Sequence, residues 1–317
     1  MSTGMTRRQA IGTLALGIGV MAVNNWSNAA AAPVKVKACL SPGSIGVRAG
    51  GRQLIDLALK HRFDAVEPPA GYLAGLSDAD LTALQQEMKQ ANLAWGAAGL
   101  PVDFRGEDAK FEADLEKLAP ASAALRRAGV NRVGTWLSPS HAQLAYEENL
   151  KRHAERLRKV ALVLKANGQR LGLEYVGTPT LRENRKNTFI YNMKGTRQLI
   201  ERIGTGNVGF VLDSWHWWTA GENEADLLSV KAEEIVSADL NDAPAGIPVE
   251  RQIDGRRELP CATGVIPVAT FVGALASVGY DGPARAEPFN KVLNDMEDDA
   301  ACAASIAALR KALATAK

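Results

Sequence analysis

Strand-like and helix-like segments alternate from residue 34 to the end of the chain, and this alternation limits the fold more than any other feature. Eight short apolar segments are predicted to be strands: 34–40, 63–67, 93–98, 132–137, 170–175, 208–212, 235–240 and 284–287. A helix-like segment follows each of them. Alternating βα units predict a parallel sheet, and eight of them predict an α/β fold of the closed (β/α)8 TIM barrel type.

The alternative architecture is an open, doubly wound sheet. Such a sheet would carry a glycine-rich phosphate loop after an early strand, and residues 41–46 (Ser-Pro-Gly-Ser-Ile-Gly) match that loop poorly. Local signals also mark the helices. Ser77 predicts a helix start, Gly168 predicts a helix end, and Pro120 predicts a kink or break within the helix expected over 108–128.

The first 32 residues have the pattern of an export signal. An arginine pair, Arg7 and Arg8, precedes an apolar run over 11–23 and an alanine stretch over 29–32, and no acidic residue occurs before Asp56. This pattern predicts a signal peptide over residues 1–32 and a single barrel domain over residues 33–317.

The arginine pair resembles a twin-arginine export signal, with Ala10 where such signals carry a bulky apolar residue. The alternatives are a general secretory signal and an uncleaved membrane anchor. The apolar run is short and glycine-rich for a membrane span, which argues against the anchor. The predicted location of the mature protein is the periplasm. The twin-arginine (Tat) export machinery is expected as a partner, and no stable membrane insertion is expected after cleavage.

Charge argues against a nucleic-acid partner. The chain has 37 Lys plus Arg and 35 Asp plus Glu, and removal of residues 1–32 takes away two arginines and no acid, which leaves 35 of each. No basic stripe is evident. Three widely spaced cysteines predict neither a metal-ligand motif nor a disulfide framework. The sequence leaves a homo-oligomer open.

Four consecutive predicted strands end on an acid. Glu174, Asp213, Asp239 and Glu287 all stand where a strand stops. The carboxyl ends of barrel strands converge on one face, where the active sites of TIM barrels lie. Four acids at one point would repel each other unless a cation lay among them, so their placement predicts a metal site.

These residues, with the Asp213-x-x-His216 motif, resemble the xylose-isomerase-like sugar isomerase and epimerase superfamily of TIM barrels. The chain further resembles the exported members of that superfamily at residues 240–244, 259–265 and 279–289. The resemblance implies that Glu174, Asp213, Asp239 and Glu287 hold one divalent ion, usually Mn²⁺, Co²⁺, Mg²⁺ or Zn²⁺. Two departures stand out: Asp239 replaces a histidine that many members carry, and Cys261 stands where glycine is expected.

Ligands that are all oxygen favour a hard ion, so Mn²⁺ is the first choice, ahead of Zn²⁺. Asp239 has two alternative roles, because four carboxylates around one divalent ion make a strongly negative site. It could stay protonated, or it could bind a substrate hydroxyl.

Four further residues are predicted to bind substrate. His216 lies three residues after Asp213, and its alternative is a packed histidine among tryptophans. Trp136, at a strand end, could stack on a sugar face. Glu67 could bind hydroxyls or pair with an arginine, and Arg257 could bind substrate oxygens or be a solvated loop charge. The other three histidines, His61, His141 and His153, are expected on helix or loop surfaces without a chemical role.

The sequence therefore predicts a metal-dependent enzyme that acts on a non-phosphorylated keto sugar. Glu174 and Glu287 would exchange a proton next to the carbonyl through an enediolate. Return of the proton gives epimerisation or isomerisation, and loss of a leaving group gives β-elimination from a 3-keto-glycoside. A multi-zinc nuclease would need more well-placed histidines than this chain has. A metal-stabilised sugar-binding protein without catalysis is the alternative of another class.

Overall fold

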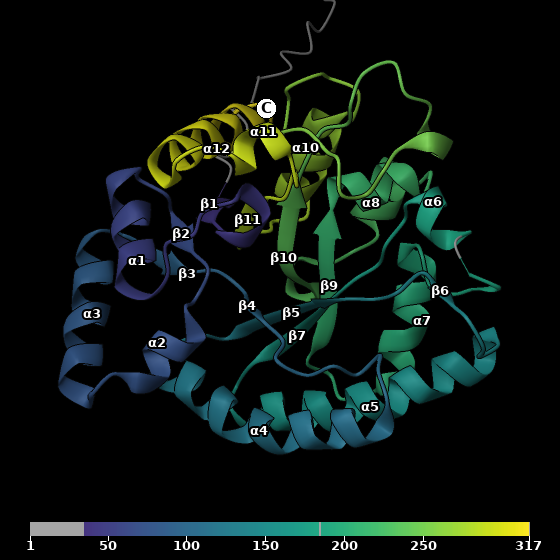
Figure 1. The fold of residues 1–317 in the computed structure, drawn as a ribbon, viewed down its shortest axis with the longest axis horizontal. Helices are drawn as coiled ribbons and strands as arrows, with labels where there is room; N and C mark the ends of the chain where they lie inside the picture. The colour runs from purple at the N-terminus through teal and green to yellow at the C-terminus, as the bar shows by residue number, and fades with distance from the viewer. Residues whose placement is uncertain (1–34, 184, 317) are drawn as a thin grey trace, which may run out of the picture. The chain divides into compact units, whose positions relative to one another are not determined.

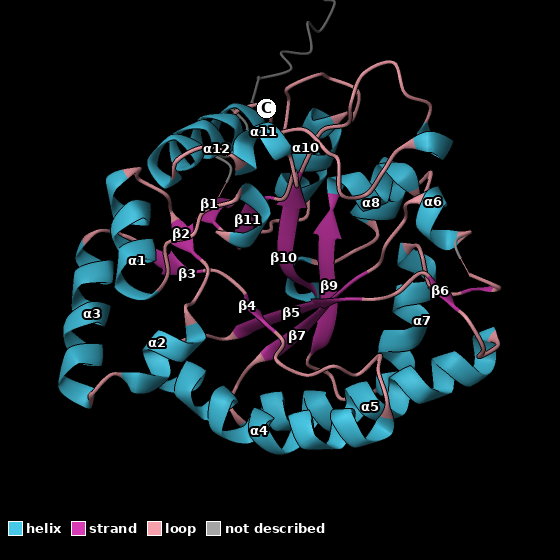
Figure 2. Cartoon of the chain, in the orientation of Figure 1, coloured by secondary structure: helices cyan, strands magenta, loops and turns pink. Residues whose placement is uncertain are grey.

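The computed structural model describes residues 35–183 and 185–316. The predicted signal segment, residues 1–32, lies outside the described residues. The strands form one curled parallel sheet in the order β3-β2-β1-β11-β10-β9-β7-β5-β4. Helices surround these strands, and β9 and β10 lie side by side and point the same way (Figures 1 and 2).

The sheet contains nine strands in eight barrel positions. The bounds are β1 Lys37–Leu40, β2 Ala65–Val66, β3 Ala94–Trp95, β4 Ala98–Gly99, β5 Arg132–Trp136, β7 Arg170–Glu174, β9 Val208–Asp213, β10 Ile235–Leu240 and β11 Pro283–Ala286. Two further short strands, β6 Ser140–His141 and β8 Asn187–Thr188, pair antiparallel and join the loops that follow β5 and β7.

The third predicted strand, 93–98, is divided into β3 and β4. The first half pairs with β2 and the second half pairs with β5, so this short segment closes the barrel. Gly96 lies at the division, and a Cβ atom there would come within 2.6 Å of the Cys39 sulfur. The predicted TIM barrel is thus confirmed, with one strand position interrupted at a glycine.

The helices follow the predicted alternation. Their bounds are α1 Gly51–Lys60, α2 Ala70–Gly75, α3 Asp78–Gln90, α4 Asp108–Arg127, α5 Tyr146–Ala166, α6 Pro179–Arg182, α7 Met193–Ile203, α8 Ser214–Thr219, α9 Glu224–Leu228, α10 Val268–Ser277, α11 Lys291–Asn294 and α12 Asp298–Leu313. Short 3-10 helices span Gly43–Ile45, Ala232–Glu234 and Val249–Arg251. None of the helices in the described part of the chain is long and apolar enough to span a membrane.

Of the kink or break predicted at Pro120, the break is wrong, because α4 runs continuously from Asp108 to Arg127. Proline removes one helix hydrogen bond, but the residues after it are rich in alanine, the strongest helix former. Phe111, Leu118 and Leu125 bury one side of this helix. Tertiary packing along the whole helix offsets the local penalty.

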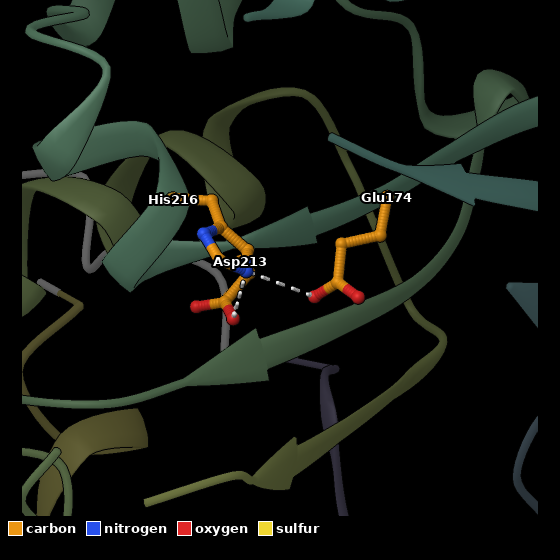
Figure 3. Close-up of side chains that lie close together, drawn as sticks. All are labelled: Glu174, Asp213 and His216. Carbon is orange, nitrogen blue, oxygen red and sulfur yellow. Dashed lines mark ion pairs between the residues drawn. The ribbon is translucent and has the colours of Figure 1, made fainter. Parts of the chain in front are cut away.

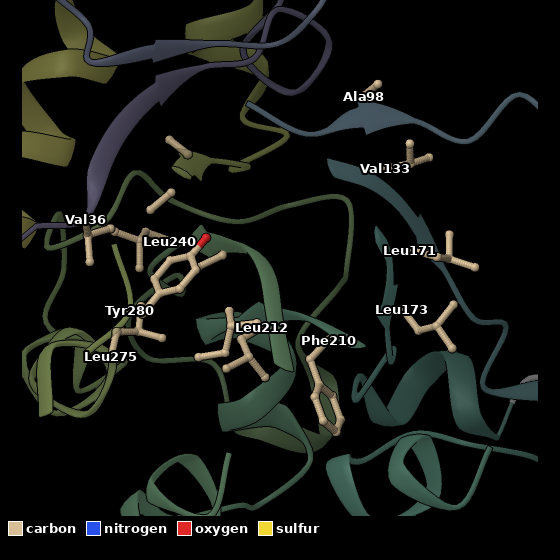
Figure 4. Close-up of a cluster of buried hydrophobic side chains, with 14 of the residues drawn as sticks. Val36, Ala98, Val133, Leu171, Leu173, Phe210, Leu212, Leu240, Leu275 and Tyr280 are labelled. Carbon is tan, nitrogen blue, oxygen red and sulfur yellow. The ribbon is translucent and has the colours of Figure 1, made fainter. Parts of the chain in front are cut away.

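Side chains alternate between the two faces of the barrel wall. Leu171, Leu173, Phe210 and Leu212 are fully buried in the hydrophobic cluster that Figure 4 shows. Successive side chains of a strand point to opposite faces, so the residues between these four point to the other face of the barrel wall. Glu174 and Asp213, the last residues of β7 and β9, belong to that second set. The expectation that His153 lies on a helix or loop surface is wrong. This residue is 2% exposed and packs edge-on against Phe104 in the apolar layer.

The inner face of the wall is built from small residues. Gly134 and Gly172 stand at inward positions beside Val211, and a Cβ atom on Gly172 would lie 2.7 Å from that valine. Small inward residues leave space above them, towards the carboxyl ends of the strands. The site therefore opens at that end of the barrel, as in other TIM barrels.

Candidate metal and substrate site

Strand register brings the four predicted acids together. Asp213 is directly opposite Asp239 across the β9–β10 pair, and Glu174 ends the adjacent strand β7. Glu174, Asp213, Asp239 and Glu287 each offer an oxygen within 4.8 Å of the others, and all four are buried. The barrel topology thus converts four distant sequence positions into one cluster.

Glu174 is the least compensated of these acids. Its Oε1 is buried and lacks a hydrogen-bond partner among the described residues. Burial raises the pKa of its carboxyl well above the usual range, and Glu287, Asp239 and Asp213 raise it further. A buried oxygen without a partner, among other carboxylates, is a place where a cation fits.

Asp213 links the strand to the helix that follows it. Its Oδ1 accepts from the backbone N–H of Trp215 at 2.7 Å, which caps the start of α8, and from Asn241 Nδ2 at 2.9 Å. Its Oδ2 accepts from Arg257 Nη1 at 2.8 Å. The cap explains why the acid and His216 are held in a fixed relation.

His216 lies over the acid cluster, as predicted. Its Nδ1 accepts a hydrogen bond from the backbone N–H of Gly177 at 3.2 Å, and Arg257 Nη2 lies 3.3 Å from its Nε2. Nε2 is 3.8 Å from Asp213 Oδ2 and 3.9 Å from Glu174 Oε1 (Figure 3). Burial lowers the pKa of the imidazole, which favours the neutral form.

Arg257 belongs to the site, and its alternative reading as a solvated loop charge is wrong. It is 2% exposed and lies against the acid cluster although it comes from the long loop after β10. Its guanidinium contacts Asp213 at 2.8 Å, Asp254 at 3.0 Å and Glu287 at 3.1 Å. Asp213 and its acidic neighbours raise the pKa of Arg257 against the effect of burial, so it stays charged.

A second arginine, Arg285, was not predicted. It forms a two-pronged pair with Asp239, from Nε to Oδ1 at 2.8 Å and from Nη2 to Oδ2 at 3.0 Å, and it contacts Glu287 Oε1 at 2.8 Å. Arg285 lies on β11, two residues before Glu287, which directly follows the strand, so both side chains point to the same face. That two-residue spacing from a predicted site acid is the sequence signal that could have found it.

The fully ionised cluster carries two negative charges. Four carboxylates contribute four negative charges, and the guanidiniums of Arg257 and Arg285 contribute two positive ones. Asp254, which also pairs with Arg257, adds a third negative charge beside this cluster. One divalent cation would therefore neutralise the four carboxylates and two arginines but not this acidic neighbour.

The remaining predicted residues line the walls of the site. Glu67 accepts a hydrogen bond from Ser41 and lies 3.9 Å from Arg285. Trp136 is 47% exposed at the end of β5, and the Arg105 guanidinium lies 4.2 Å from its ring centroid. Neither Ser41 nor Arg105 was predicted, because only the fold places them beside these walls.

Two cavities meet at the acid cluster. One has a volume of about 300 Å³ and extends towards β1, β2 and β5. The other has a volume of about 310 Å³ and lies between the loops after β5, β7 and β10. Trp136, Glu174 and Glu287 line both.

A family match agrees with this geometry. Residues 55–312 match the xylose isomerase-like TIM barrel family. The chain belongs to this family. Among curated relatives, an inosose isomerase from Bacillus velezensis (strain DSM 23117 / BGSC 10A6 / LMG 26770 / FZB42) is 25% identical over 260 residues, which cover 80% of this chain and 89% of that protein.

Solved structures of the family share the fold. A xylose isomerase domain protein from Alicyclobacillus acidocaldarius subsp. acidocaldarius is 29% identical, with a TM-score of 0.76 over 88% of this chain and 99% of its own. The IOLI protein with a bound zinc atom is 19% identical, with a TM-score of 0.73 over 89% and 99%. An L-ribulose 3-epimerase is also 19% identical, with a TM-score of 0.64.

Cys261, one of the two departures from the family pattern, has a conformational explanation. This residue has a φ of 62°, in the left-handed region that glycine adopts most easily. The loop therefore keeps a glycine-like backbone at this position although the side chain is a cysteine. The departure affects the loop and none of the four acids.

Proposed function

We propose that this member of the xylose isomerase-like family is a divalent-metal-dependent isomerase or epimerase of a non-phosphorylated keto sugar. The observation that carries the proposal is the cluster itself: four buried carboxylates, two compensating arginines and one carboxylate oxygen without a partner among the described residues. An unpaired buried carboxylate oxygen destabilises the fold, and a bound cation would compensate it.

Glu174, Asp213, Asp239 and Glu287 would hold the ion. Bound there, a divalent ion would act as a Lewis acid on a carbonyl and stabilise the negative charge of an enediolate. Oxygen ligands favour Mn²⁺ over softer ions. The IOLI protein, which has the same fold, binds a zinc atom, and this supports a divalent ion in this protein without deciding which one.

Glu174 and Glu287 are proposed to move the proton. In the metal-free protein the pKa of Glu287 is raised to about 7, chiefly by burial, and a bound cation would lower it. Glu174 would remove the proton next to the carbonyl, and Glu287 would return one. His216 and Arg257 would bind the substrate oxygens on which charge develops.

The relatives support the reaction class. Three matched curated proteins are inosose isomerases. Isomerisation and epimerisation begin alike, with loss of a proton next to a carbonyl. Elimination from a keto-glycoside has the same beginning, and its unsaturated product would identify it.

Solvent exchange tests the proposal. Turnover of keto sugars with Mn²⁺ in D₂O should place deuterium next to the carbonyl of the product, as measured by NMR. Glu174→Gln should reduce label and product together by at least about a hundredfold, because an amide cannot accept the proton. Glu201→Gln, at an exposed position on α7, is the matched control. Metal-dependent binding without any exchange would instead indicate a sugar-binding protein.

We also propose that the mature protein is periplasmic after twin-arginine export. The motif around Arg7 and Arg8 supports this. Arg7→Lys with Arg8→Lys should retain the precursor in the cytoplasm, and normal export of that double variant would exclude the twin-arginine route.

A further inference from the structure

The guanidinium of Arg257 is held at two edges by different partners. At one edge, Nη1 donates to Asp213 Oδ2 at 2.8 Å and to Glu287 Oε2 at 3.1 Å, which are two oxygens of the acid cluster. At the other edge, Nε donates to the backbone carbonyl of Asp254 at 2.8 Å, and Nη2 donates to Asp254 Oδ1 at 3.0 Å. A guanidinium is planar and rigid, so a partner that holds one edge also fixes the direction of the other. Asp254 therefore sets the direction in which Nη1 faces the cluster.

Asp254 is itself held from a second loop. Thr178, in the loop after β7, donates from Oγ1 to Asp254 Oδ1 at 2.9 Å, and the same hydroxyl oxygen accepts from the indole N–H of Trp215 at 2.9 Å. Thr178 and Trp215 are both fully buried. A hydroxyl that donates to one partner and accepts from another has a fixed orientation. Asp254 thus takes its position from the barrel wall and not from its own loop alone.

These contacts form a closed ring. Trp215 also donates its backbone N–H to Asp213 Oδ1, so the hydrogen bonds run from Asp213 through Trp215, Thr178, Asp254 and Arg257 and return to Asp213 Oδ2. The ring joins the corner between β9 and α8 to the loops that follow β7 and β10. Hydrogen bonds in such a network support one another, so the loss of one member releases its neighbours.

Asp254 acts on the site through Arg257. It is not one of the four acids that gather at the cluster. It contacts Arg257 Nη2 at 3.0 Å, whereas His216 Nε2 is 3.8 Å away. Burial tends to raise the pKa of its carboxyl, but Arg257, His216 and Thr178 outweigh burial and lower that pKa, so the carboxylate is ionised near neutral pH. The contact between Asp254 and Arg257 is therefore a charge-assisted one.

We propose that Asp254 is a positioning residue, which holds Arg257 in the direction needed to bind a substrate oxygen on which negative charge develops. This inference rests on the proposed proton-transfer function and adds to it a residue outside the acid cluster. A displacement of about 1 Å in a group of this kind can reduce turnover about a hundredfold. Thr178 and Asp254 together prevent that displacement.

Two substitutions at position 254 test the inference. The probes are D-fructose and an inosose, and NMR follows their deuterium exchange from D₂O with Mn²⁺ present. Asp254→Ala removes the acceptor and should lower kcat about ten- to a hundredfold with little change in KM, because the contact matters most where charge develops. Asp254→Asn keeps an acceptor oxygen for Thr178 and Arg257 and should lower kcat no more than about threefold. Glu250→Ala, at an exposed position of the same loop, is the matched control and should change neither constant.

A double-mutant cycle separates positioning from a merely structural role. In an Arg257→Gln background, Asp254→Ala should have no further effect beyond about twofold, because the residue through which it acts is absent. A residue that only stabilised the loop would lower turnover by the same factor in both backgrounds. Calorimetric titration should show that Asp254→Ala binds Mn²⁺ no more weakly than the unaltered protein, since Asp254 is not a proposed ligand.

A second pair of variants serves if Asp254→Ala does not fold, which urea denaturation would show. Thr178→Val has nearly the same shape but lacks the hydroxyl that holds Asp254, and it should lower kcat about tenfold. Thr178→Ser keeps the hydroxyl and should retain most of the turnover.

The outcomes distinguish this inference from the proposed function. Equal losses in Asp254→Ala and Asp254→Asn would show that charge and not position matters, and would overturn the inference. An undiminished effect of Asp254→Ala in the Arg257→Gln background, or weaker Mn²⁺ binding, would overturn it as well. Exchange by the unaltered protein leaves the proposed function intact in these cases. Absence of exchange by the unaltered protein with every keto sugar would overturn both.

Discussion

At the scale of the residue, Arg285 decides how the charge of Asp239 is compensated. Asp239 adds a fourth buried carboxylate to the cluster, and a buried carboxylate requires a compensating positive charge. Arg285 supplies it through two hydrogen bonds to Asp239, whose side chain is fully buried. The two residues form one unit, and neither can be changed alone without leaving an uncompensated charge.

Arg285→Met should therefore lower the free energy of unfolding by about 3 kcal/mol, as measured by urea denaturation. The double variant Asp239→Asn with Arg285→Met should recover part of the loss, because the orphaned carboxylate is gone. Arg52→Met, at an exposed ion pair, should cost no more than about 1 kcal/mol. An Arg285→Met protein as stable as the wild type would contradict the paired-unit interpretation.

At the scale of the element, the corner between β9 and α8 joins fold and chemistry. One oxygen of Asp213 caps α8 while the other contacts Arg257 in the site. The helix that this cap begins also carries His216. A single side chain thus sets the position of the acid and of the imidazole above it.

Asparagine and alanine at position 213 should separate these two roles. Asparagine is as good an N-cap as aspartate, so Asp213→Asn should be about 1 kcal/mol more stable than Asp213→Ala. Both variants should lose at least about tenfold in Mn²⁺ affinity, because the charged ligand is absent. Calorimetric titration with Mn²⁺ and chemical denaturation give the two readouts, and equal stability of the two variants would argue against the capping role.

At the scale of the whole molecule, the barrel brings together more acids than it can leave ionised without a cation. The pKa values of Glu174, Asp239 and Glu287 are all raised, with burial as the largest cause. Each group then binds more protons in the folded state than in the unfolded state. For Glu287 this difference lies between its ordinary pKa of 4.5 and about 7, so stability declines as pH rises through that window.

A divalent ion should reverse this decline, because it binds the ionised carboxylates. The increase in melting temperature on adding Mn²⁺ should be larger at pH 8 than at pH 6. At a hundred times the dissociation constant it should reach roughly 5–10 °C. Scanning calorimetry measures the melting temperature with Mn²⁺ and with EDTA at each pH. Groups outside the cluster, such as buried His153, change both melting temperatures alike, so their effects cancel in the difference.

The same Mn²⁺-induced shift should be nearly absent in Glu174→Gln. An equal shift at both pH values would mean that the acids are ionised without the ion, contrary to their raised pKa values.

The sequence alone determined the barrel and the four acids. Strand and helix periodicities are local properties, and an acid at a strand tip is visible in the chain because the carboxyl ends of parallel strands meet at one face. Glu174, Asp213, Asp239 and Glu287 could be predicted to converge for this reason. His216 followed from its three-residue spacing to Asp213.

Only the tertiary structure decided how the charges are compensated. Arg257 comes from a long loop whose path has no local signal, and the structure buries it among three acids. The division of the third strand at Gly96 and the continuity of α4 through Pro120 also depend on packing against neighbours. Partner choice among buried charges is set by distances between remote segments, and those distances exist only once the barrel has closed.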